Sequence, residues 1–289
     1  MAASEETTGL SYIFSHAMCA VPSLEAGNMA YEHLGFRVHV GGRHAIATQS
    51  CVVPLARGYL ELISIYDEAA ARSSPRRAKI LDFITREGGG LIGFALRTDT
   101  MEADLERLHD FGLPYGGPVE AARTTPEGPI LRWQVLRPTP QPCPAVLPIL
   151  VAGDVATPSF SGNANTIVSA AGISLVSAEP ARLVDDYRIL LESEPVDQQA
   201  RPGVDAVATV FDAGGFAIEV LEPTREGVAQ RTLDRFGSAP VELQFVAEEL
   251  DALAGEVGLS VCRDEVVIPP VLAAGVRMTV KAAAQSRVV

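Results

Sequence analysis

The stretch "SYIFSHAMCAVPSLEAGNMAYEHLGF", residues 11–36, carries the pattern that decides the fold. Its first part, 11–21, is rich in apolar residues and predicts a β-strand. Ser23 can then cap a helix, because its side chain can accept a hydrogen bond from a free amide of the first turn. Apolar residues return near helical spacing until Gly35, which is typical of a helix end. We therefore expect a strand followed by a helix.

Three short strands complete a unit around this stretch. "RVHVGG" alternates apolar and polar residues, part of "ATQSCVVPL" does the same, and "YLELISIY" follows a turn at "ARG". The same order of patterns begins again near residues 91, 171 and 240. A glycine turn precedes the expected last strand of each copy: Gly58, Gly128, Gly215 and Gly275. The sequence predicts an α+β fold of four βαβββ units with mostly antiparallel sheet.

A proline-rich segment, "RPTPQPCPAVLP" at 137–148, separates the four units into two pairs. One βαβββ unit has a sheet face that it cannot cover alone, so two units are needed for one domain. We expect two domains, 9–140 from the first two units and 165–285 from the last two. A chain of 289 residues has the length for both.

Composition excludes several classes of function. The net charge of −13 disfavours nucleic acids and anionic membranes as partners. The four cysteines form no C-x-x-C pair, so a cysteine zinc site is not expected. The first ten residues do not read as a signal peptide, and the longest apolar run, 145–153, is too short to span a bilayer. We expect a cytoplasmic protein whose partner is a small molecule, and we leave a homodimer open.

The residues "SHAMCAVPSLEAGNMAYEHLGFRVHVGGRH" and "GYLELIS" resemble the vicinal oxygen chelate superfamily, also called glyoxalase-like. "LPILVAG" and "GNAN" are similar to the central stretch of its long, four-unit subgroup. The resemblance covers most of the chain and is most specific in the first unit. It implies that paired units curl into cup-shaped domains, of which the second is degenerate here. Lyases, isomerases, dioxygenases and metal-free binding proteins share this fold, so the fold alone does not fix the reaction.

The resemblance also implies a metal site. It puts ligands at His16, on the first strand, and at Glu61, in "YLELIS" on the last strand of the first unit. Imidazole nitrogen with carboxylate oxygen suits zinc, nickel, manganese or iron. His44 follows a turn at the start of the next strand and can point into the cup, which makes His44 and Glu61 the candidate catalytic groups.

Two ligands do not make a catalytic metal site, which usually has three protein groups. Gly93 of the second unit stands where the resemblance implies another histidine. Glu242 or Gln244, on the first strand of the fourth unit, would complete the site if the first and fourth units form the cup.

Further residues are candidates for the substrate pocket. Arg132 can clamp a substrate carboxylate, although a solvated strand arginine is the plainer interpretation. Trp133 is either core or cavity wall. Glu219 and Glu242 lie near ligand positions of the third and fourth units. His33, in the last turn of a helix, is expected to be an exposed surface group, where the helix dipole favours a partly charged imidazole.

Two functions follow from these residues. The first is a metal-dependent lyase, isomerase or dioxygenase acting on a small oxygen-rich organic substrate. In it the metal polarises adjacent oxygens, and Glu61 or His44 moves a proton. The second is a metal-free protein that binds or sequesters a small molecule, with His16 and Glu61 left as a buried hydrogen-bonded pair. The metal content of the purified protein separates the two.

Overall fold

The computed structural model describes residues 12–125, 128–153 and 159–283. The first unit consists of β1 (Ile13–Ala20), α1 (Leu24–His33), β2 (His39–His44), β3 (Thr48–Pro54) and β4 (Tyr59–Ile65). Ser23 caps α1, and its side-chain oxygen accepts a hydrogen bond from the Ala26 amide at 3.1 Å. The βαβββ order predicted for this unit is confirmed.

The second unit is longer than the sequence suggests. It consists of β5 (Gly90–Arg97), α4 (Met101–Asp110), β6 (Tyr115–Thr124), β7 (Ile130–Pro138) and β8 (Ile149–Ala152). The expectation that its last strand begins just after Gly128 is wrong, because the strand that begins there, β7, is followed by β8. The prolines between these strands interrupt the backbone pairing without ending the sheet. The sheet therefore continues past residue 140, the expected end of the first domain.

The remaining elements form the second half of the chain. The third unit consists of β9 (Ile167–Val176), α5 (Pro180–Leu191), β10 (Asp197–Arg201), β11 (Ala206–Asp212) and β12 (Ala217–Pro223). After α6 (Val228–Phe236), the fourth unit consists of β13 (Ala239–Ala247), α7 (Leu250–Glu256), β14 (Glu265–Ile268) and β15 (Met278–Ala282). Within the described residues this last unit is one strand short of βαβββ, and an isolated bridge from Cys262 to Glu265 stands before β14.

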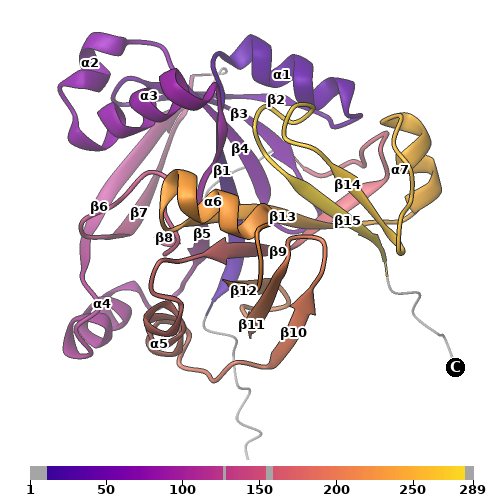
Figure 1. The fold of residues 1–289 in the computed structure, drawn as a ribbon. Helices are drawn as coiled ribbons and strands as arrows, with labels where there is room; N and C mark the ends of the chain where they lie inside the picture. Colours follow the sequence, from indigo (N-terminus) through magenta and orange to yellow (C-terminus); the bar gives the residue numbers. More distant parts are fainter. Residues whose placement is uncertain (1–11, 126–127, 154–158, 284–289) are drawn as a thin grey trace, which may run out of the picture.

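The strands form two sheets that pack side by side (Figure 1). The first two units close into an eight-stranded barrel in the order β1-β4-β3-β2-β6-β7-β8-β5. The last two form an open seven-stranded sheet in the order β10-β11-β12-β9-β13-β15-β14. In every unit the first and last strands lie parallel to each other, and the other neighbours are antiparallel. The expected α+β architecture of two glyoxalase-like halves is confirmed.

A short seam closes the barrel. β2 and β6 pair through only two residue pairs, Arg43 with Thr124 and His44 with Arg123. Because the seam joins the first unit to the second, it decides which side chains of the two units meet inside the barrel.

Two helices, α2 (Glu68–Arg72) and α3 (Pro75–Glu87), connect the first two units. Ile80 and Phe83 of α3 belong to one buried cluster with Met18 of β1 and Ile92 of β5. The helix α3 therefore covers part of the barrel, as the purple ribbon in Figure 1 shows. None of the helices in the described ranges is long and apolar enough to cross a membrane.

A continuous apolar core joins the two sheets. Phe14 of β1 stacks on Phe216, which precedes β12, with 4.3 Å between ring centroids. Phe36 and Phe245 of β13 make a second ring contact between the halves, at 6.4 Å. Large aromatic rings bury much apolar surface, so these contacts hold the barrel against the open sheet.

Candidate functional site

A cavity of about 280 Å³ lies inside the closed barrel, against α3. Successive side chains of a strand point to opposite faces of the sheet, so alternate residues of each strand face the interior. The strands β1, β4 and β7 show this alternation clearly. Their contributions to the cavity lining are His16, Met18, Tyr59, Glu61, Ile63, Trp133, Val135 and Arg137.

Two imidazole rings turn toward one carboxylate in this cavity. The distance from His16 Nε2 to Glu61 Oε2 is 3.8 Å, and that from His44 Nε2 to Glu61 Oε1 is 3.3 Å. A hydroxyl group occupies the other nitrogen of each ring, since Ser15 Oγ lies 3.0 Å from His16 Nδ1 and Thr48 Oγ1 lies 3.0 Å from His44 Nδ1. His16 and Glu61 are buried, with 5% and 6% of their surface exposed. The local strands thus bring together the three residues singled out in the first unit.

Burial and the neighbouring charges set the protonation of this cluster. Burial lowers the pKa of His16 to about 4, and the carboxylate of Glu61 opposes that shift only in part. Burial alone would raise the pKa of Glu61, but the hydrogen bond from His44 and the charges of His44, His16 and Arg123 lower it to about 2. At neutral pH, His16 is therefore neutral and Glu61 is ionised. These are the forms in which the two groups bind metal ions.

The chemistry of this donor set fits a divalent transition metal. Two imidazoles and one carboxylate are the ligands of many non-haem iron sites, and zinc, nickel and manganese accept them as well. A hydroxyl at each Nδ1 orients the ring, as the outer partners of metal-bound histidines do. In the conformation seen here, however, no three His, Cys, Asp or Glu side chains of the described residues surround a common ion position. The two rings contact the carboxylate directly instead.

The donors all come from the first unit. β1 and β5 pair antiparallel, with His16 opposite Ala95 and Met18 opposite Gly93, so an approximate two-fold relation makes Gly93 the counterpart of His16. β4 sets Glu61 beside Met18, and β8 sets Ile149 beside Ala95. Ile149 is therefore the counterpart of Glu61. The second unit has no donor at either position.

Completion of the site from the fourth unit, the expectation for Glu242 or Gln244, does not fit this topology. Both residues lie on β13 of the open sheet, whereas the first unit closes its barrel with the second. His44 of β2 is the third polar group beside His16 and Glu61.

Glu219 and Glu242 belong to a separate buried cluster of the open sheet. Each has 1% of its surface exposed, and Arg201 of β10 makes ion pairs with both. Ser174 Oγ donates a hydrogen bond to Glu219 at 2.7 Å. Arg277 Nε donates one to Glu242 at 3.0 Å, which is its second ion pair. Two arginines balance two carboxylates here, and neither carboxylate lines the barrel cavity.

The other predicted residues fall on different surfaces. Trp133 is part of the cavity wall, and its ring meets that of His44 edge-on at 6.4 Å between centroids. Arg132 comes directly before Trp133 on β7. It is exposed, is not among the residues that line the cavity, and pairs with Glu120. His33 is exposed at the end of α1, as expected.

Four arginines that line the cavity were not predicted from the sequence: Arg76, Arg77, Arg123 and Arg137. Arg123 is buried and lies opposite His44 across the β2–β6 seam. Arg137 is two residues beyond Val135 and four beyond Trp133, so strand alternation could have put it on the same face. Arg76 and Arg77 lie on α3, in the connection between the first two units, where nothing in the sequence shows that the helix returns to the barrel.

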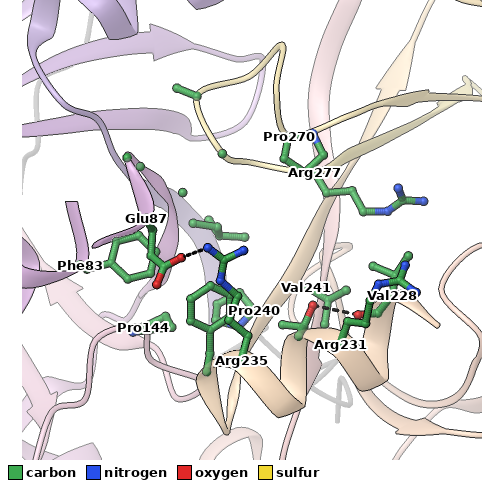
Figure 2. A pocket seen from close by; sticks show the side chains of 18 of the residues that line it. Phe83, Glu87, Pro144, Val228, Arg231, Arg235, Pro240, Val241, Pro270 and Arg277 are labelled. Carbon is green, nitrogen blue, oxygen red and sulfur yellow. Dashed lines mark hydrogen bonds and ion pairs between the residues drawn. The ribbon is translucent and has the colours of Figure 1, made fainter. Parts of the chain in front are cut away.

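A larger cleft, of about 870 Å³, lies between one end of the barrel and the open sheet (Figure 2). Glu87, the last residue of α3, pairs with Arg235 of α6 across it. Phe83 and Pro144 line one side, and Val241 and Pro270 line the other. No histidine or cysteine is among its lining residues, so the barrel cavity is the better candidate for chemistry despite its smaller volume.

The chain is similar to a known protein family in sequence and to solved structures in fold. The sequence model of a family described as "Glyoxalase-like domain" matches residues 14–191. No curated protein matches the chain. A hypothetical protein from Staphylococcus aureus has a similar structure, with a TM-score of 0.68 at 12% identity over 94% of this chain and 100% of the other.

Two further solved structures are similar at lower scores. A mutant of 4-hydroxymandelate synthase from Streptomyces coelicolor has a TM-score of 0.58 at 14% identity, over 85% of this chain and 74% of the other. A fusion protein of a xylose isomerase-like TIM barrel and a 4-hydroxyphenylpyruvate dioxygenase also has 0.58, at 13% identity, over 96% of this chain and 50% of the other. At such identities the likeness concerns the fold alone.

Proposed function

This chain belongs to the glyoxalase-like domain family, and from that premise we propose that its barrel is the active site of a divalent-metal-dependent enzyme. The family match, 14–191, includes nearly all of the barrel with His16, His44 and Glu61. One observation carries the proposal: two imidazole Nε2 atoms are directed at one buried, ionised carboxylate. The substrate is a small oxygen-rich organic molecule, whose size is bounded by a cavity of about 280 Å³.

His16 and Glu61 would hold the metal, with His44 as the third ligand. When bound, a divalent ion would polarise the adjacent oxygens of a chelating substrate and stabilise negative charge on them. Ser15 and Thr48 keep the Nδ1 atoms occupied, so that both Nε2 atoms stay turned to the cavity.

Glu61 is also the candidate proton acceptor. If His44 binds the metal through Nε2, it releases Oε1, and the carboxylate oxygen that does not hold the metal can receive a proton from a substrate carbon. A carboxylate with a pKa of about 2 is a weak base, so it can remove such a proton only if the resulting charge is strongly stabilised. This weakness is a physical reason to prefer metal-assisted chemistry over proton transfer by Glu61 alone.

The ligand set bears on the reaction type. Among lyase, isomerase and dioxygenase, two histidines with one carboxylate are typical of non-haem iron oxygenases, which favours iron and the dioxygenase type. The structural neighbours that carry 4-hydroxymandelate synthase and 4-hydroxyphenylpyruvate dioxygenase in their names are consistent with this choice.

Metal analysis tests the proposal. Wild-type protein, His16→Ala, Glu61→Ala and the surface control His33→Ala are purified without chelator and loaded in turn with iron, nickel, manganese and zinc. We expect about one ion per chain in the wild type and in the control, and loss of that ion in the other two variants. A wild-type protein that none of the four metals can load contradicts the proposal.

A metal-free binding protein is the second candidate function. The direct contact of 3.3 Å between His44 and Glu61 favours it, since the carboxylate then already has a partner. If no metal loads, this function takes the place of the first. It is tested by screening small molecules for those that raise the melting temperature of the wild type but not that of Trp133→Ala.

A further inference from the structure

Positive charge gathers inside a protein of net charge −13. The barrel cavity is lined by Arg76, Arg77, Arg123 and Arg137. Two carboxylates, Glu61 and Glu120, also line it. Glu120 is paired with the exposed Arg132, which leaves Glu61 as the carboxylate that faces these guanidinium groups. Charged side chains in cavities are usually paired, so an excess of cations needs an explanation.

Three of these arginines are close enough to repel one another, and we call Arg76, Arg77 and Arg137 the arginine cluster. Burial lowers the pKa of Arg76 to about 9, and the charges of Arg77 and Arg137 lower it too. Burial and the charge of Arg77 lower the pKa of Arg137 to about 10. All three guanidinium groups are still charged at neutral pH, and their repulsion is a cost to the folded protein.

The chain neutralises the arginine cluster only in part, through the more distant charge of Glu61 on Arg76. Among the described residues, no member has a carboxylate within ion-pair distance. Arg77 Nε donates to the backbone oxygen of Ile46 at 3.3 Å, and Arg137 Nε is buried without a hydrogen-bond partner in the part of the chain that the structure describes. A buried donor left without an acceptor costs free energy, which an oxyanion in the cavity would recover.

Barrel topology sets Arg137 of the arginine cluster across from Glu61. In the cyclic strand order β1-β4-β3-β2-β6-β7-β8-β5, β7 is the fourth strand from β4 in either direction. Arg137 of β7 and Glu61 of β4 therefore project into the cavity from opposite walls. A molecule bound between them has one end at the guanidinium groups and the other at the imidazoles and the carboxylate.

We propose that the cavity takes a small organic anion whose acid group, a carboxylate or a phosphate, binds to the arginine cluster while its reacting carbon faces Glu61. The inference rests on the proposed function, in that it takes the same cavity as the substrate site. The planar fork of a guanidinium group binds both kinds of acid group through paired hydrogen bonds. The positive lining also repels cations, so it favours acids among polar ligands.

Calorimetric titration with simple anions tests this inference. The probes are malonate, inorganic phosphate and malonamide, the uncharged analogue of malonate. Each is titrated into the full chain after chelator treatment and dialysis, so that no metal can hold the anion. The variants are Arg76→Gln and Arg137→Gln. The control is Arg72→Gln, which removes an exposed arginine that pairs with Asp82 on the same helical connection.

We expect malonate or phosphate to bind to the wild type and to Arg72→Gln, and at least tenfold more weakly to both cluster variants. Malonamide should not bind. Tighter binding of malonate indicates a carboxylate substrate, and tighter binding of phosphate indicates a phosphate ester. The glutamine variants remove a repelling charge, so their melting temperatures should equal or exceed that of the wild type. Weak binding then cannot be ascribed to unfolding.

Two results would overturn the inference: no binding of either anion to the wild type at millimolar concentration, or unchanged affinity in both cluster variants. Failure of the proposed function looks different. In that case, no metal loads, while anion binding persists and still depends on Arg76 and Arg137. Metal loading without anion binding refutes the anionic substrate and leaves the metal site intact.

Discussion

Glu61 and Glu219 hold the same position on the last strands of their units, one beside two imidazoles and the other beside Arg201. The parallel register shows the equivalence, because β1 sets Met18 beside Glu61 and β9 sets Ser174 beside Glu219. Imidazole can be neutral and can offer a lone pair to an ion, whereas guanidinium stays charged and offers none. A carboxylate at this position thus belongs to the proposed ion site in the barrel and to a closed ion-pair cluster in the open sheet.

Acid should destabilise the protein through His16 before it does so through Glu61. The pKa of His16 is lowered from 6.5 to about 4 in the folded protein. At a pH between these two values, His16 is therefore protonated in the unfolded chain and neutral in the folded protein. Stability contributed by neutral His16 is complete above pH 6.5 and falls as the pH drops toward 4, by on the order of 2–3 kcal/mol. The free energy of unfolding, measured by urea titration at several pH values, checks this.

Glu61 acts in a lower pH window with the same sign. Its pKa is lowered from 4.5 to about 2, so its contribution is present above pH 4.5 and is lost as the pH falls toward 2. The variant His16→Gln should have a flatter profile between pH 6.5 and 4, while His33→Gln, on the surface, should keep the wild-type profile. Equal slopes in the wild type and in His16→Gln would contradict the assignment.

Gly42→Ala should open the barrel seam. Gly42 has φ +122°, and a Cβ atom there would lie 2.0 Å from the carbonyl oxygen of Thr124 on β6. The added methyl group must push β2 and β6 apart, at a cost of about 2 kcal/mol or more, and it shifts His44 away from Glu61. Urea denaturation measures the cost, and metal loading reports the displacement of His44.

Gly112→Ala is the matched control for the seam variant. Gly112 also has a positive φ, +75°, but a Cβ atom there meets nothing within 4 Å. Its cost should stay at about 1–2 kcal/mol, from the backbone conformation alone, with metal loading unchanged. Equal costs and equal metal loading in the two variants would show that the seam does not set the position of His44.

Arg201→Met should destabilise the open sheet without touching the barrel. The substitution leaves Glu219 buried without its cation and removes one of the two cations beside Glu242. Loss of one partner of a buried ion pair costs about 3–5 kcal/mol. Arg188→Met, which removes an exposed arginine paired with Asp185 and Glu194, should change the free energy of unfolding far less. A small cost for Arg201→Met would contradict the stabilising role of its buried ion pairs, whereas a loss of metal loading in it would show that the two clusters are not independent.

His33→Ala should be silent in every assay. The side chain is exposed in the last turn of α1 and is not among the residues that line either cavity. Its free energy of unfolding should stay within about 0.5 kcal/mol of the wild type, as for most surface substitutions. Loss of metal or anion binding in this variant would mean that His33 takes part in the site despite its exposure.

Local pattern was enough to predict the first unit. Strand alternation, the Ser23 cap and the glycine stops act within a few residues, and the sequence contains all of them. The β8 strand was not predicted because it is short and follows a segment with four prolines, and its pairing with β5 and β7 depends on distant partners. Pairing of the first unit with the second, rather than with the fourth, is likewise a long-range choice that no local pattern encodes.

The candidate site, too, could be predicted only where it depends on local sequence. His16 and Glu61 could be singled out because the family resemblance implies ligands at their positions on the first and last strands of the best-defined unit. The orientation of His44 depends on the seam to Arg123, and the arginine cluster exists only because α3 returns to β7. Charges that converge from separate elements are visible only once the chain is folded.

The absence of donors at Gly93 and Ile149 makes the barrel interior one-sided. A barrel with donors in both units would hold a substrate in two equivalent orientations, related by its two-fold axis. Here the donor wall and the guanidinium wall differ, so an acid lodged between them presents a single face to Glu61. Any bond made or broken there would have a fixed handedness, and one of two mirror-image substrates would be the preferred one.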